Sequence, residues 1–163
     1  MALWKWWIVI AGTALVVGGV AWLLKLCVIV ATDGRVVATG APGAFCDIGS
    51  YALMVGSTGV GLRLAINLEN TLRVTLAVLS PIAFNILFAI FLGIGYALVA
   101  TGRIIVGDAL PSYLLDEGGI FVSAVVGIVA GIWLVVGVVV RGVPDKADGA
   151  SGGRQAESLT TAR

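Results

Sequence analysis

Two cysteines and no histidine limit the chemistry that this 163-residue chain can carry out. Without an imidazole there is no Ser-His or Cys-His catalytic pair, no HExxH zinc site and no ordinary axial haem ligand. Two thiols alone do not hold an iron–sulfur cluster. We therefore expect no catalytic residues, no metal and no cofactor, and no enzymatic activity.

Cys27 and Cys46 are the only thiols in the chain. The topology derived below places both on the outer side of the membrane, where a disulfide would close a loop of about 20 residues and contribute about 3 kcal/mol. Two unrelated buried thiols fit the sequence equally well, since free cysteine is a common apolar filler. A catalytic thiol pair is disfavoured, because there is no CxxC motif and no visible neighbour to lower a thiol pKa.

Asn85 lies near the middle of the uncharged segment 74–100, one helical turn after Pro81. A polar side chain at this depth suggests a hydrogen bond between helices. A path for substrate or ions would more often contain a carboxylate or a basic residue. None of the predicted spans has Asp or Glu at its centre, which argues against proton-coupled transport through this chain alone.

Gly127 and Gly131 form a GxxxG motif in the last apolar segment. Small residues at this spacing let two helices approach closely and recover dispersion contacts. The motif predicts helix packing, either within one bundle or at a dimer interface.

Two other patterns have simpler interpretations. The glycine-rich segment 56–61 lacks the Lys-Ser/Thr ending of a phosphate-binding loop, so we reject a nucleotide site and expect a flexible or broken helix. Asp108, Asp116 and Glu117 make the region before the last span acidic. We interpret these carboxylates as solvated loop charges, with a weak cation site or a surface for a basic partner as the alternative.

The composition requires an apolar environment for these residues. The chain is 60% hydrophobic and 12% charged, with a mean hydropathy of +1.09, whereas a soluble domain carries about 25% charged residues. So short a soluble chain could not hide this apolar excess. The net charge of +1 indicates no nucleic-acid partner. We expect an integral membrane protein in contact with lipid.

Apolar segments predict an all-α protein with four transmembrane helices in a bundle over residues 1–141. About 20 residues cross the hydrocarbon core, and the predicted spans cover 6–30, 48–66, 74–100 and 118–140. The connecting outer loops would be 31–47 and 101–117. Residues 142–163 have the polar, Gly/Ser/Ala-rich composition of a flexible cytoplasmic tail.

The segment 48–66 is the least apolar of the four, and the distribution of basic residues favours its crossing. Cytoplasmic loops are enriched in Lys and Arg. With four spans the cytoplasmic side, which includes both termini, carries Lys5, Arg63, Arg73, Arg141, Lys146, Arg154 and Arg163, against Lys25, Arg35 and Arg103 outside. The alternative is three spans, with 62–72 as an interfacial helix.

No motif identifies a family, so function rests on the character of the helices. We expect a structural or accessory subunit of a membrane assembly, packing against itself as a homo-oligomer or against other membrane proteins. Gly127, Gly131 and Asn85 are the candidate contact residues, with Cys27 and Cys46 as a possible clasp. The alternatives are an oligomeric small channel or transporter with Asn85, Ser80 and the second span along its path, and a thiol-redox membrane enzyme.

Overall fold

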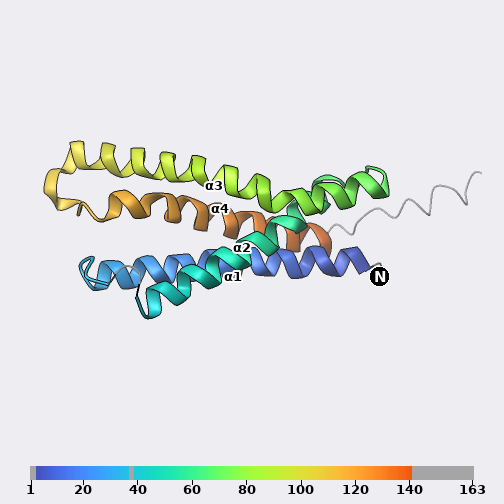
Figure 1. Ribbon diagram of the computed structural model, residues 1–163, viewed down its shortest axis with the longest axis horizontal. Helices are drawn as coiled ribbons and strands as arrows, with labels where there is room; N and C mark the ends of the chain where they lie inside the picture. The colour runs from blue at the N-terminus through green and yellow to red at the C-terminus, as the bar shows by residue number, and fades with distance from the viewer. Residues whose placement is uncertain (1–2, 37–38, 141–163) are drawn as a thin grey trace, which may run out of the picture.

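The computed structural model describes residues 3–36 and 39–140, which form four α-helices and one 3-10 turn (Figure 1). The elements are α1 (Leu3–Ala31), α2 (Ala41–Leu64), α3 (Asn70–Val106), η1 (Gly107–Ala109) and α4 (Leu114–Val139). The predicted all-α fold class is confirmed. The predicted tail, 142–163, lies outside the described residues.

Three of the helices are long and apolar enough to cross a membrane. They are α1, α3 and the Glu117–Val139 part of α4. The protein is therefore a small multi-span helical membrane protein, and its exposed apolar surface contacts lipid.

α2 is the helix that hydropathy alone does not mark as a span. Its 24 residues would measure about 36 Å, enough for a hydrocarbon core of about 30 Å. Glycine and polar residues dilute its apolar character. It runs back along α1 and then reaches the beginning of α3 (Figure 1).

The alternative interfacial helix over 62–72 is not formed. α2 ends at Leu64, a turn follows, and α3 begins at Asn70. The Arg73 guanidinium closes this turn by donating hydrogen bonds to the carbonyl oxygens of Ile66 at 3.0 Å and Leu68 at 3.1 Å. A charged residue that the sequence places at a span boundary thus fixes a tight connection.

The connections between the helices are shorter than the segments predicted to lie outside the membrane. α2 begins at Ala41, with Pro42 in its first turn, where the fixed φ of proline suits a helix and its missing N–H is not needed. α3 continues to Val106, and α4 begins at Leu114. The predicted boundaries marked the ends of uncharged segments, but a helix can continue through a charged residue at its end.

The four helices alternate in direction, and each packs against the next, with α4 returning to α1. α1 and α3 lie at opposite corners, and their described backbones do not approach each other. The core contains large apolar side chains from α1, α2 and α4: Ile8, Leu15, Trp22, Leu53 and Leu134. We call the end with residue 3 and the 65–69 turn proximal, and the end with the α1–α2 and α3–α4 connections distal.

α3 is the peripheral helix of the bundle. In its most apolar segment 6% of the residues are buried, against 39% in the corresponding segments of α1 and α4. Its one fully buried residue is Gly95, which lies against the backbone of Gly118 and Gly119 in α4. The absence of side chains at this crossing lets the two helices meet near the distal end.

Candidate functional site

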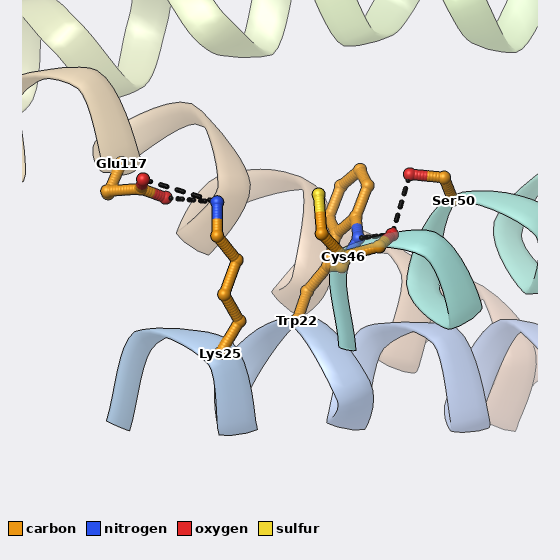
Figure 2. A network of polar contacts seen from close by, with 5 residues as sticks. All are labelled: Trp22, Lys25, Cys46, Ser50 and Glu117. Atoms are coloured by element: carbon orange, nitrogen blue, oxygen red, sulfur yellow. Dashed lines mark hydrogen bonds and ion pairs between the residues drawn. The ribbon is translucent and has the colours of Figure 1, made fainter. Parts of the chain in front are cut away.

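A buried ion pair joins α1 to α4 near the distal end of the bundle. The Lys25 ammonium donates hydrogen bonds to both Glu117 carboxylate oxygens, at 3.0 and 3.2 Å (Figure 2). The two side chains are only 8% and 7% exposed. Glu117 lies near the amino-terminal end of α4, where the helix dipole also favours a negative charge.

The burial of both charges explains why they must be paired. An isolated charge in an apolar interior is costly, so ionisable groups within spans pair with one another or with polar groups. Removing one partner of such a pair leaves the other charge uncompensated. The Lys25–Glu117 pair therefore fixes the register of α1 against α4.

The interpretation of Glu117 as a solvated loop charge is wrong, and Lys25, which the sequence places at the outer end of the first span, is also buried. The sequence did contain a signal. Lys25 interrupts an apolar pattern that continues for several residues beyond it, which indicates a charge inside a helix that needs a partner. Nothing in the sequence identified that partner, 92 residues away.

Trp22, one helical turn before Lys25, connects α1 to two other helices. Its indole N–H donates to the carbonyl oxygen of Cys46 at 3.1 Å, and the Ser50 hydroxyl donates to the same oxygen at 2.8 Å (Figure 2). The ring lies against Gly49 in α2, and its centroid is 5.2 Å from that of Phe88 in α3. Trp22 thus lies where α1, α2 and α3 come together.

The predicted disulfide is not present in the structure, in which Cys27 and Cys46 are free thiols. Cys27 is exposed and Cys46 is half-buried. On α1, Lys25 and Ile29 face the bundle, whereas Cys27 falls between them on the outer side. It is the backbone carbonyl of Cys46 that binds α1, through Trp22.

Gly127 and Gly131 lie against other helices of the same chain. A Cβ atom at residue 131 would be 2.5 Å from the carbonyl oxygen of Gly12 in α1. A Cβ atom at residue 127 would be 2.6 Å from Cδ2 of Leu53 in α2. The GxxxG surface is therefore already covered within one chain.

Asn85 faces away from the bundle. Its side chain is exposed, and its Nδ2 donates to the carbonyl oxygen of Pro81, one turn earlier in the same helix, at 2.8 Å. Ser80 lies on a different side of α3, lining a cavity with Gly61 and donating to the Leu76 carbonyl. Within one chain, Asn85 and Ser80 do not line a common path.

Arg63 at the proximal end is stabilised differently from Lys25 at the distal end. Arg63, in the last turn of α2, places its guanidinium 5.8 Å from the ring centroid of Trp133 in α4. Among the described residues no carboxylate pairs with it. Cation–π contact and proximity to the helix carboxyl terminus both favour the charge there.

The polar groups described above do not assemble into a reactive centre. Among the side chains that the structure describes, which do not include those of Asp108 and Asp116, no three of His, Cys, Asp or Glu are grouped to hold a metal ion. Comparisons of the chain with protein-family models, with curated proteins and with solved structures found no match. Apart from Asn85, the polar groups described above mainly join one helix to another.

Proposed function

We propose that this protein is a structural or accessory subunit of a membrane assembly, and that the exposed face of α3 packs against a transmembrane helix of a neighbouring chain. The observation that carries the proposal is the position of Asn85. Its carboxamide is exposed near the middle of an apolar span, and its one hydrogen bond is to its own helix. Lipid offers such a group no partner, whereas a neighbouring helix does.

The residues around Asn85 suit close helix contact. Four more residues follow it at intervals of four on α3, all exposed and none larger than threonine: Ala89, Gly93, Ala97 and Thr101. A Cβ atom at residue 93 would meet nothing within 4 Å. Small residues in such a row let a second helix approach, and an amide, as both donor and acceptor, can pair with a polar group or another amide.

The GxxxG surface of α4 is the other candidate for docking, and its burial also favours α3. Gly127 and Gly131 are in contact with α1 and α2, so they are not available to a neighbouring chain. α3 offers the largest uncovered apolar face, because so little of its span is buried.

A four-span topology with both termini in the cytoplasm fits this role. α2 runs beside α1 and is long enough to cross. The basic residues divide with seven on the cytoplasmic side and three, Lys25, Arg35 and Arg103, on the outer side. In a variant without native cysteines, Asn67→Cys should react with an impermeant thiol reagent only from the cytoplasmic side. Labelling from outside would overturn this orientation.

The test of the role is the mass of the complex extracted from native membranes in nanodiscs. We expect the wild-type chain with a stoichiometric partner, either a foreign subunit or a second copy. Asn85→Leu should weaken the association about 3- to 20-fold, corresponding to roughly 0.6–1.7 kcal/mol for an interhelical hydrogen bond. Asn85→Gln, which keeps the amide, should retain more of it. A wild-type monomer, or an association unaffected by Asn85→Leu, would contradict the proposal.

A further inference from the structure

A cavity of about 420 Å³ lies at the distal end between α1, α3 and α4. Val30 lines it from α1, Leu98 and Val99 from α3, and Phe121 and Val122 from α4. Glu117 lines it as well, and every other described lining residue is apolar or glycine. The backbones of α1 and α3 do not approach each other, and α4 forms the floor of the cavity between them.

The cavity opens toward lipid. Its rim residues Val30, Leu98 and Phe121 are 54%, 61% and 54% exposed, while Gly118 on its floor is buried. These residues lie on or next to helices that are apolar enough to cross the membrane. A hollow with apolar walls and an apolar rim at this depth is a place for a hydrophobic ligand rather than for water.

We propose that this cavity binds one acyl chain of a membrane phospholipid. Its volume falls within the range of about 300–1,000 Å³ typical of small-ligand sites. An α-helix is about 10–12 Å across with its side chains, so a space of 420 Å³ would hold no more than about one turn of it. An acyl chain is slender, is present all around the rim, and matches walls that offer no hydrogen bonds beyond Glu117.

Glu117 determines which kind of acyl chain fits. Its carboxylate is held by Lys25, which does not line the cavity, so the wall presents the acidic member of the pair. Among the described lining residues, the carboxylate of a free fatty acid would meet the like charge of Glu117 and no basic side chain. An esterified chain carries no charge along its length and leaves its head group at the membrane interface. The cavity therefore favours a phospholipid chain over a fatty acid.

This inference does not depend on the proposed docking of α3. Leu98 and Asn85 are 13 residues apart, which places them about 140° apart around the helix. The inference needs only a single chain, because every described lining residue belongs to it. A monomer should bind the acyl chain as well as an assembled subunit does.

The experiment uses the full chain in nanodiscs that contain phosphatidylcholine with a photoactivatable diazirine on one acyl chain. Labelled residues are located by peptide mass spectrometry. We expect labelling of residues 95–99 and 118–122 well above that around Val129, which is 62% exposed on α4 and outside the cavity. Equal labelling at both places would mean ordinary boundary lipid and would overturn the proposal.

Two matched variants complete the test. Val122→Phe, which fills the cavity, should lower its labelling several-fold, whereas Val129→Phe, the same change on the same helix, should not. Leu98→Phe blocks the rim from an exposed position and should give the same loss if Val122→Phe fails to fold. A diazirine fatty acid should label the cavity less than the phospholipid does; stronger labelling would refute the assignment to an esterified chain. Unchanged phospholipid labelling in a folded cavity variant would refute the site itself.

Discussion

α1 and α3 are both long helices with apolar segments of nearly equal mean hydropathy, yet 39% of one segment and 6% of the other are buried. The surroundings of the glycines differ as well, except at Gly95, where α3 crosses α4. Gly12, Gly18 and Gly19 of α1 each lie against the backbone or side chains of another helix, whereas Gly93 of α3 faces open space. Hydropathy shows that a helix can enter the membrane, and the surroundings of its small residues show whether it meets protein or lipid there.

The polar groups of the two helices differ in the same way. Lys25 and Trp22 of α1 have their hydrogen-bond partners on α4 and α2. Asn85 of α3 bonds only to its own helix. The Lys25 and Trp22 side chains of α1 are thus satisfied inside the bundle, whereas Asn85 of α3 faces away from it.

Among the substitutions that test the packing of α1, removing one partner of the Lys25–Glu117 ion pair should have the largest effect on stability. Lys25→Met leaves the Glu117 carboxylate buried without a cation. We expect a loss of about 3–5 kcal/mol in the free energy of unfolding, as for other buried pairs from which one partner is removed. Equilibrium unfolding of the purified protein in lipid-like detergent measures it.

The double variant Lys25→Met with Glu117→Met is the control for this prediction. Replacing a whole buried pair with apolar residues of similar size is often neutral or stabilising. The double variant should therefore recover most of the lost stability. A Lys25→Met protein as stable as wild type would mean that the pair is not buried as described.

Substituting a glycine should destabilise the bundle where the glycine is packed against α1 but not where it is exposed on α3. The effect should be smaller than that of breaking the ion pair. Gly131→Leu places a side chain where Cβ alone would be 2.5 Å from the Gly12 carbonyl oxygen, and should cost about 1–3 kcal/mol of stability. Gly93→Leu on α3 should leave bundle stability within about 0.5 kcal/mol, as at surface positions, while reducing association with a partner. Equal destabilisation by the two variants, measured by thermal unfolding, would remove the contrast between the helices.

Trp22→Phe should give the smallest of the three effects. The variant keeps an aromatic ring beside Phe88 but loses the hydrogen bond to the Cys46 carbonyl, which still accepts one from Ser50. We expect a loss of about 0.5–1.5 kcal/mol. Trp6→Phe, at a 57% exposed position, should change unfolding less, and the reverse order would contradict the role assigned to Trp22.

The sequence predicts the helices well because they follow from long uncharged segments, whose length and hydropathy are local properties. The contacts between helices are not local. Lys25 and Glu117 lie far apart in sequence, and the contact of Gly95 with Gly118 and Gly119 also joins two separate helices. The GxxxG motif predicts close packing, but only the folded chain shows that its partners are α1 and α2.

The loop boundaries could not be read correctly for a related reason. Uncharged segments end where charges begin, but helices end where backbone hydrogen bonds stop. Glu117 is one residue outside the predicted last span and lies inside α4. The exposure of Asn85 likewise depends on how α3 sits on the bundle, so its depth in the membrane was predictable and its direction was not.

The central claim, that α3 carries the docking face, is tested most directly by photo-crosslinking in native membranes. A benzophenone amino acid is placed at residue 86, beside Asn85, or at residue 129 on α4; Ile86 and Val129 are both 62% exposed. The account predicts crosslinks to another protein chain, foreign or identical, from residue 86 and only lipid adducts from residue 129. Lipid adducts alone from residue 86, or protein crosslinks from residue 129 instead, would contradict it.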